Sequence, residues 1–484
     1  MKKPNNSIKR NIGYQTIYQV LITCLPLITA PYLARTLGAS QQGVFSFSNS
    51  IMKYFALVAM LGLNNLGTRS IAEIREDRGI QTQRFNSIYS LQLLSSAITT
   101  TIYIIYVIFV CRDNKNIAAI QTLSIIACVF DVNWLFFGRE EFKITVTRNI
   151  VIRLSVVILI LLFVKKPDDL YIYALIMCGS TLLSNFALWM IKKKHIDRFK
   201  FDFKGAVNNL KPAMVLFIPL LAMTVYHVMD STMLGLLSDY ENCGYYYNAD
   251  KVINIPLGII TGFSTVLFPR IVSIINNESD EKFKKVFSKS VEGMILISTV
   301  MSFGIASIAK EFSPFFFGDG FDPCVALIIW LAPVMIFKAV SSAIRYQFLV
   351  PKKKEKYLTW SVVAGAVVNV IANYLLIPPF GALGAVYGTI IAEGTACIFQ
   401  ICCIKKDVPI LKTIIQTLPY FIISGVMYAV VRFVANTIHT AAFYKIVIEI
   451  TSGGFVFLVL CLLYNLISKK ETIIGDILHS FSIR

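Results

Sequence analysis

Charged residues are scarce in this chain of 484 residues. Asp, Glu, Lys and Arg make up 15% of it, and hydrophobic residues make up 56%. A soluble domain carries about 25% charged residues, and the mean hydropathy here is positive, at +0.66. These values exclude an ordinary soluble protein and predict an integral membrane protein. Fourteen membrane-spanning helices would take roughly 280 residues, at about 20 residues each, and would leave only short connectors.

Histidine and clustered cysteine are also lacking. The chain has four histidines and ten cysteines, and none of the cysteines lies in a CxxC or Cys/His pattern. We therefore expect no metal and no cofactor, and we interpret the cysteines as small buried hydrophobic residues. The sequence contains no nucleophile–base motif and no glycine-rich phosphate loop. The longest connectors on the predicted outer side have about fifteen residues, so the sequence argues against an enzyme such as a membrane polymerase or acyltransferase.

Apolar runs separated by polar connectors recur along the whole chain and predict about fourteen transmembrane helices in an all-α fold. The predicted spans cover residues 12–34, 44–66, 86–110, 117–138, 144–164, 170–191, 211–236, 249–272, 288–309, 323–349, 357–378, 382–404, 412–434 and 443–467.

The basic residues predict how these spans are oriented, because Lys and Arg are enriched in cytoplasmic connectors. With the N-terminus in the cytoplasm, 33 of the 46 Lys and Arg residues fall on the cytoplasmic side and 9 on the other side. Both termini are then cytoplasmic. The placement also accounts for the net charge of +18, since these residues lie beside anionic lipid, and it argues against a nucleic-acid partner.

Two segments at the turns of predicted helical hairpins resemble each other. LGASQQGVFSFSN (37–49) and LGLLSDYENCGYYYNA (234–249) both read Leu-Gly, a polar turn, Gly, and then bulky and small residues. This similarity predicts two parallel six-helix bundles with substrate between them, unless two glycine-containing hairpins resemble each other by chance. The predicted bundles cover residues 1–195 and 196–406, and residues 407–484 hold helices 13 and 14 plus a cytoplasmic tail.

Six segments spread along the chain resemble the polysaccharide and O-antigen repeat-unit flippases of the multidrug/oligosaccharidyl-lipid/polysaccharide exporter superfamily. They lie in the predicted topological order, from the first outer turn to the twelfth helix. The sequence departs from the family pattern at Ser231, because relatives often have a basic residue directly after the Asp that corresponds to Asp230. The segments are YLARTLGASQQGVFSFSNSI (32–51), LGLNNLGTRSIAEIRED (61–77), WLFFGREEFKITVTRNI (134–150), DSTMLGLLSDYENCGYYYNADKV (230–252), VLFPRIVSI (266–274) and the PKKKEKY…TIIAE stretch (351–393).

The resemblance implies a transporter of the bacterial cytoplasmic membrane. It would move an undecaprenyl-pyrophosphate-linked oligosaccharide from the inner to the outer leaflet by alternating access. An ion gradient, of H⁺ or Na⁺, or the membrane potential would drive it, and polysaccharide polymerase machinery is a possible partner. The alternative in the same superfamily is a cation-coupled multidrug exporter. That alternative predicts a cavity of acids and aromatics, whereas the candidate helices here are richer in basic residues.

Three basic residues lie on the helices that begin the two predicted halves: Arg35, Lys53 and Lys251. An unpaired charge within a bilayer costs at least ~2.5–3.5 kcal/mol, and Lys and Arg are the natural partners of a phosphate group. We therefore expect these three to bind the pyrophosphate in a water-filled cavity. The alternatives are a structural ion pair for Lys53 and ordinary interfacial anchoring for Arg35 and Lys251.

Asp230 is the acid that stands out, because it lies within the seventh span with His227 three residues earlier on one helical face. The pair is a candidate for binding a coupling ion or for gating. Alternatively, Asp230 pairs with Lys251 and locks one conformational state. Weaker candidates are Glu393, which alternatively caps a polar patch, and Arg153 and Arg345, which with Lys338 fit snorkelling or interhelical pairing.

Overall fold

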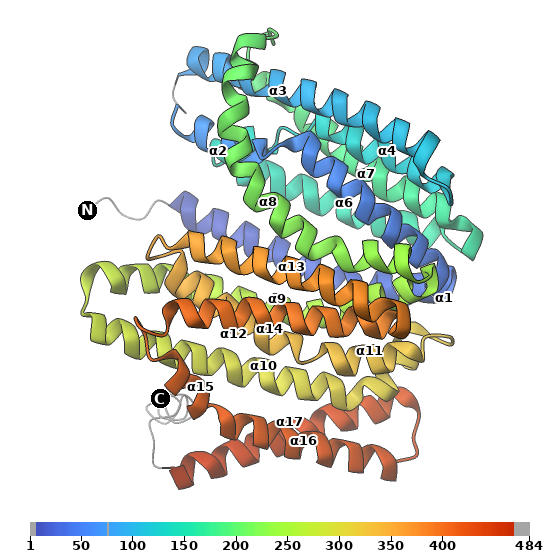
Figure 1. The fold of residues 1–484 in the computed structure, drawn as a ribbon, viewed down its shortest axis with the longest axis vertical. Helices are drawn as coiled ribbons and strands as arrows, with labels where there is room; N and C mark the ends of the chain where they lie inside the picture. Colours follow the sequence, from blue (N-terminus) through green and yellow to red (C-terminus); the bar gives the residue numbers. More distant parts are fainter. Residues whose placement is uncertain (1–5, 75–76, 469–484) are drawn as a thin grey trace. The chain divides into compact units, whose positions relative to one another are not determined.

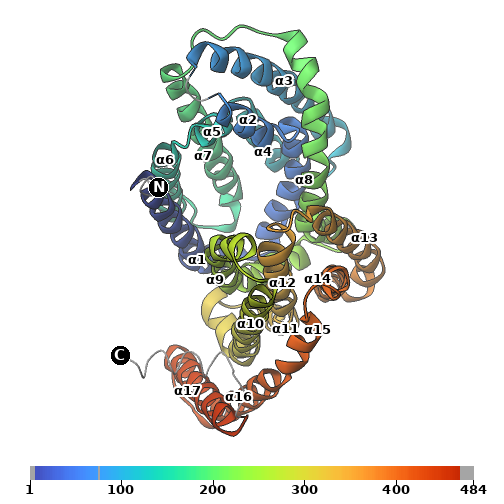
Figure 2. The ribbon, with the colours of Figure 1, turned by 90° about the vertical axis from the view of Figure 1, so that its left-hand side faces the viewer.

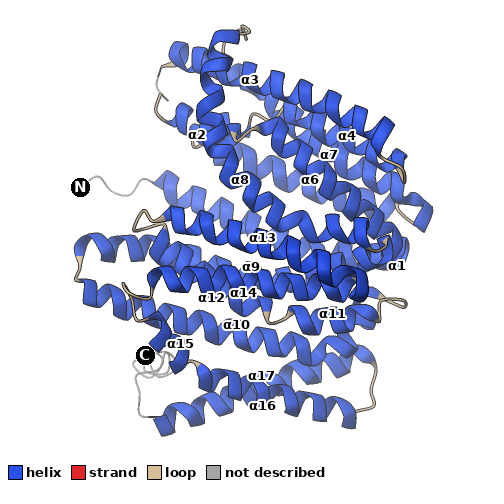
Figure 3. Cartoon of the chain, in the orientation of Figure 1, coloured by secondary structure: helices blue, strands red, loops and turns tan. Residues whose placement is uncertain are grey.

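A computed structural model describes the backbone of residues 6–74 and 77–468 and the side chains from Leu25 onward. That part of the chain consists of helices joined by loops and contains no β-strand (Figure 3). It contains 13 helical segments that are long and apolar enough to cross a membrane. The predicted all-α membrane fold is therefore confirmed. The two ends of the chain, residues 1–5 and 469–484, lie outside the described residues, and so does the predicted cytoplasmic tail.

The chain forms two compact units, with the boundary between Gly244 and Tyr245. In Figure 1 the first unit runs in colour from blue to green. The six-helix bundles predicted to end at residues 195 and 406 stay a prediction. The helices of the first unit are α1 (Asn6–Met60), α2 (Leu63–Ala72), α3 (Arg78–Ile105), η1 (Tyr106–Val110, a π-helix), α4 (Lys115–Val129), α5 (Asn133–Gly138), α6 (Phe142–Phe163), η2 (Pro167–Asp169), α7 (Leu170–Ile191), η3 (Lys192–Lys194) and α8 (Phe203–Leu237).

The first two predicted spans lie on one element, α1, which is broken at a single residue. Gly38 has φ 73° and ψ 174°, a conformation outside the helix that glycine adopts without steric cost. The expected turn at LGASQQG is therefore a kink with helix on both sides. Because α1 holds two of the fourteen predicted spans, the described residues contain 13 long apolar segments.

The first unit is built around α1, which packs against α3, α4, α6 and α8, while α4 also packs against α7. The core near α2 and α5 holds the fully buried ring of Trp134, whose Nε1–H donates to Gln92 Oε1 at 3.0 Å. Polar pairs of this kind satisfy buried donors where neither water nor lipid can. They fix the register of helices that would otherwise slide along apolar surfaces.

The second unit continues from α9 to the last helix. Its helices are α9 (Tyr240–Asn277, of which residues 240–244 belong to the first unit), α10 (Asp280–Phe317), α11 (Pro323–Leu331), α12 (Val334–Ile344), η4 (Arg345–Leu349, a π-helix), α13 (Glu355–Phe380), α14 (Ala382–Ile404), α15 (Ile410–Gln416), α16 (Leu418–Thr437) and α17 (Ala442–Ser468).

The centre of the second unit is α10, which packs against α11, α12, α16 and α17, and α14 pairs with α13 along its length. The last two helices form a hairpin that lies beside α10 (Figure 2). Its core contains Tyr420, Met427 and Phe457, with Leu296 and Phe303 packed against them. The hairpin is thus an addition on one side of α10, and the separate part predicted for residues 407–484 stays a prediction.

Candidate functional site

A strip of hydroxyl groups joins α1 to α8 in the first unit. Thr232 Oγ1 lies 2.8 Å from Ser50 Oγ and 3.3 Å from the Tyr54 hydroxyl, and Ser46 Oγ lies 3.2 Å from Ser231 Oγ. Hydroxyl pairs between membrane helices each contribute modestly, on the order of 0.6–2 kcal/mol. Here they align the half of α1 that follows Gly38 with the C-terminal half of α8.

Asp230 and His227 both lie on α8, but in different surroundings. Asp230 is buried at 7% exposure, and its carboxylate acts electrostatically on the Tyr54 hydroxyl across the helix pair. His227 is exposed, and its ring lies 5.9 Å from that of Tyr226. The carboxylate therefore belongs to the hydroxyl strip, whereas the imidazole lies outside it. Their predicted joint role in ion coupling stays a prediction.

Lys53 and Arg35 lie on α1, one on each side of the Gly38 kink, and the protein covers neither of them. Lys53 directly precedes Tyr54, which contributes to the hydroxyl strip. A cation here is deep in a membrane-length helix, and such residues in known membrane proteins face a water-filled cavity or a partner. The structure leaves both cations accessible, as binding to an anionic group requires.

Two glycines form a close crossing at the beginning of α9. A Cβ atom on Gly43 would lie 1.6 Å from the carbonyl oxygen of Tyr240, and one on Gly244 would lie 1.9 Å from the carbonyl oxygen of Ala39. All four residues belong to the first unit. Each glycine therefore contacts the residue four places before the other glycine. This two-fold arrangement brings together the two LG…G segments that resemble each other in sequence, and only glycine permits such an approach.

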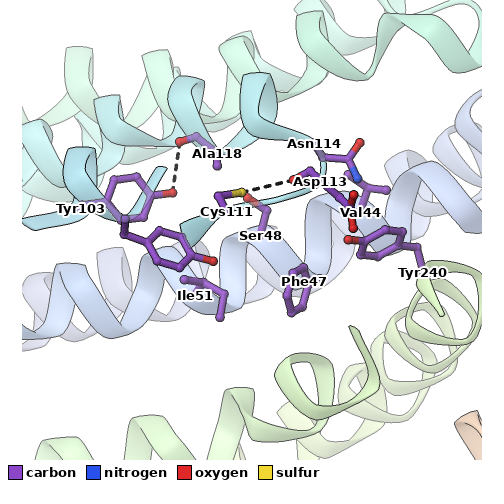
Figure 4. A pocket seen from close by; sticks show the side chains of 11 residues that line it. Val44, Phe47, Ser48, Ile51, Tyr103, Cys111, Asp113, Asn114, Ala118 and Tyr240 are labelled. Atoms are coloured by element: carbon purple, nitrogen blue, oxygen red, sulfur yellow. Dashed lines mark hydrogen bonds between the residues drawn. The ribbon is translucent and has the colours of Figure 1, made fainter. Parts of the chain in front are cut away.

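The Tyr240 side chain extends this crossing to the connection between η1 and α4. This side chain lies near those of Asn114 and Asp113, and all three line a small depression with residues of α1 and α3 (Figure 4). Cys111 lies in the same depression, and burial raises the pKa of its thiol. The Tyr240 side chain and this connection both belong to the first unit.

The second unit contains a buried ion pair within its membrane-length helices. Lys338 Nζ on α12 lies 3.5 Å from Glu393 Oε1 on α14, with side-chain exposures of 24% and 8%. One turn along α14, Cys397 lies against Ser341 of α12. The pair therefore joins two helices near the middle of their spans, where an uncompensated charge is expensive.

The other predicted basic residues occupy three unlike positions. Lys251 on α9 is half-buried, with its ammonium 3.8 Å from the centre of the Tyr247 ring, which is a cation–π contact. Arg345 at the beginning of η4 is also half-buried, 5.2 Å from the Tyr346 ring. Arg153 on α6 is exposed. In the second unit the structure brings together Lys338 and Glu393. The predicted binding of pyrophosphate by Arg35, Lys53 and Lys251 stays a prediction.

A charged network connects the end of α7 with the α5–α6 connection, outside the membrane-length segments. Arg139 Nε lies 2.9 Å from Glu141 Oε1, and His195 Nε2 lies 3.0 Å from Glu141 Oε2. Arg139 also donates to Gln81 at 2.9 Å. Burial lowers the pKa of His195, and the nearby Arg139 acts in the same direction against the opposing effect of Glu141.

Sequence reasoning missed two features. The Gly43–Gly244 crossing was signalled by the glycine that ends each repeated turn, but its contact was not predicted. A second polar cluster, formed by Glu311, Arg432, Lys445 and Glu449, was not singled out. Its signal was an acid, Glu449, inside the last apolar span.

Comparison with known proteins supports the resemblance in the sequence. The chain is 23% identical to an O-antigen transporter, so named, of Escherichia coli strain K12 over 385 residues, which are 78% of this chain and 92% of that protein. The corresponding protein of Shigella dysenteriae is 23% identical over 82% of this chain and its own full length. A glycan biosynthesis flippase, so named, of Haloferax volcanii is 25% identical over 75% of this chain and 76% of that protein.

Solved structures show the same fold. An inward closed conformation of the lipid II flippase MurJ superposes with a TM-score of 0.73, at 16% identity, over 95% of this chain and all of that chain. An inward-facing multidrug transporter of the MATE family gives 0.60 at 13% identity, over 81% of this chain and 98% of that chain. The family model described as polysaccharide biosynthesis protein matches residues 8–275, more than half of the sequence. The chain therefore belongs to the polysaccharide biosynthesis protein family.

Proposed function

We propose that this protein is a flippase that moves lipid-linked oligosaccharide repeat units across the membrane for cell-surface polysaccharide synthesis. The observation that carries the proposal is its similarity to the O-antigen transporters over 92% and 100% of their lengths, together with family membership. The substrate we propose is an undecaprenyl-pyrophosphate carrier whose head group crosses while its tail stays in lipid.

The physical problem of such transport is the anionic pyrophosphate, which needs compensating charge within the bilayer. Lys53 and Arg35 are accessible cations on α1, and Lys251 and Arg345 are half-buried cations of the second unit. A Lys or Arg bound to phosphate forms charge-assisted hydrogen bonds that are roughly twice as strong as neutral ones. The hydroxyl strip beside Lys53 supplies further donors and acceptors, of the kind that bind sugars.

The remaining parts of the proposal concern orientation and energy. We place the protein in the bacterial cytoplasmic membrane with both termini in the cytoplasm, because Lys and Arg are concentrated in the alternate connectors. Alternating access would be driven by H⁺, Na⁺ or the membrane potential, with Asp230 and His227 as the candidate coupling residues. Polysaccharide polymerase machinery would receive the product on the outer face.

The test is deletion of the gene in its own host, followed by two measurements. Surface polysaccharide should be lost, and lipid-linked repeat units should accumulate in a form that a glycan-binding lectin reaches only after the inner membrane is opened. The gene supplied on a plasmid should reverse both effects. Accumulation on the outer face, accessible to lectin in intact spheroplasts, would contradict the proposal, because the block would then lie after flipping. Loss of drug resistance with normal polysaccharide would favour the multidrug-exporter alternative.

A further inference from the structure

The α16–α17 hairpin meets α10 at a cluster of four ionisable residues, which lies far from the hydroxyl strip in sequence. Glu311 of α10 accepts from Arg432 Nη1 of α16 at 2.6 Å and lies 3.3 Å from Lys445 Nζ of α17. The Glu311 side chain is 9% exposed. One carboxylate thus binds both cations, and this joins all three helices.

The fourth member, Glu449, has no such partner. Its side chain lies one turn after Lys445 on α17, on the same helical face, and the residue is 1% exposed. Among the described residues, neither of its carboxylate oxygens has a hydrogen-bond partner. Its electrostatic neighbours are Glu311 from α10, Arg432 from α16 and Lys445 from its own helix.

An ionised carboxylate is not stable in this position. Both cations already bind Glu311, so a charged Glu449 would have no donor, and it would lie beside another negative charge. The effective cost of burying an ion is several kcal/mol. A neutral carboxyl group without a partner costs about 1–3 kcal/mol. The neutral form is therefore the one that the packing favours.

We propose that Glu449 is a proton-binding site at the junction of α10, α16 and α17. With the proton bound, the cluster carries two cations and one anion, and release of the proton adds a second anion without a donor. The proton has a short route, because all four residues lie within two turns of a helix end. His439, in the α16–α17 connection, is exposed and is not among the groups that act on Glu449.

Dicyclohexylcarbodiimide tests the assignment, because it reacts with protonated carboxyl groups in apolar surroundings and leaves a stable N-acylurea. The purified protein is treated at a series of pH values, and the modified peptide is identified by mass spectrometry. Glu449 should be modified near neutral pH and progressively less as the pH rises, whereas the ion-paired Glu311 should not be. Glu449→Gln should reduce modification of that peptide at least tenfold.

The matched control is Glu292→Gln, which changes another α10 carboxylate at the hairpin, one that accepts a hydrogen bond from Tyr420 at 2.6 Å. It should leave the modification of Glu449 unchanged. Replacing choline chloride with NaCl should also have no effect. Protection by Na⁺ would overturn the proton assignment in favour of a cation site, and modification of Glu311 in place of Glu449 would reverse the roles of the two acids.

A second measurement covers the case in which the reagent does not reach the site. Since the folded state binds the proton more tightly than the unfolded state, the thermal stability that Glu449 contributes should be lost as pH rises. Wild type should therefore lose stability as pH rises above the unfolded Glu value of about 4.3 more steeply than Glu449→Gln, which is permanently neutral. Identical pH profiles for the two proteins would overturn the proposal. Neither measurement depends on transport, so failure here is distinguishable from failure of the flippase function.

Discussion

Gly43 of α1 and Gly244 of α9 contact each other's helix in the same way, each against the carbonyl group four residues before the other glycine. The two glycines are 201 positions apart, and they come from the two segments that share the LG…G pattern. Contacts of this type bring Cα–H groups against carbonyl oxygens and add ~0.5–1 kcal/mol each. The crossing therefore depends on the absence of a side chain at both positions.

Replacing either glycine should separate the two helices. Gly43→Ala places a methyl group where the backbone carbonyl group of Tyr240 lies, and overpacking of this kind costs ~1–3 kcal/mol. We expect a lower melting temperature in detergent and reduced surface polysaccharide. The matched control is Gly179→Ala on α7, where a Cβ would meet nothing within 4 Å; it should be neutral or stabilising by up to ~1 kcal/mol. Equal effects of the two substitutions would contradict the importance of the crossing.

Lys53 should matter for transport more than for folding. Removing one charge-assisted contact to phosphate costs about 1.5–3 kcal/mol, so Lys53→Ala should reduce export roughly tenfold or more at matched protein levels, as measured by surface polysaccharide. Asp230→Ala should also reduce export. Lys204→Ala is the control, since it removes an exposed cation at the beginning of α8. Normal export by both Lys53→Ala and Asp230→Ala would reject this site.

The Lys338–Glu393 pair should behave as a unit. Breaking a buried pair by removing one partner costs ~3–5 kcal/mol, whereas removing both charges is often nearly neutral. Lys338→Met and Glu393→Leu should each lower the melting temperature, and the double variant should be more stable than the sum of the two losses predicts. Strict additivity in this double-mutant cycle would show that the two side chains do not interact.

His195 should make stability depend on pH in the mildly acidic range. Its pKa is lowered, chiefly by burial, so the unfolded chain binds the proton first as pH falls. The contribution is complete above the unfolded value of about 6.5 and is lost as pH falls below it. His195→Gln should flatten the decline in melting temperature between about pH 7.5 and about pH 5.5. An unchanged slope would assign the decline to other groups.

Cys111 should report on the contact between Tyr240 and the η1–α4 connection. Burial raises the pKa of its thiol, and only the thiolate reacts. In a variant that keeps Cys111 as its single cysteine, maleimide labelling should need a higher pH than labelling of an exposed thiol. Tyr240→Phe removes a hydroxyl that lies near Asn114 and Asp113 in the same depression as Cys111 and should speed labelling. An unchanged labelling rate would mean that the Tyr240 hydroxyl does not restrict access to Cys111.

The sequence predicted the spans far better than the contacts between them. Apolar length alone locates membrane helices, because each must cover the bilayer by itself. The partner of a polar residue depends on how helices rotate and slide against one another, which hydropathy does not encode. Thus the sequence identified Lys338 and Glu393 as charges within spans but did not pair them across 55 positions. Likewise, the glycines of the repeated turns were evident, but their mutual contact was not.

The ion pairs of Glu311 have a consequence for how the protein is made. Glu311 and Arg432 are 121 residues apart, so α10 enters the membrane well before its partners have been synthesised. At about 5–20 residues per second, the ribosome needs roughly 6–24 s to cover that distance. During this interval the end of α10 carries an acid with neither of its cations, and the nascent chain must hold it at the lipid surface or keep it protonated. A ribosome stalled before α16 would therefore leave Glu311 at the lipid surface or protonated.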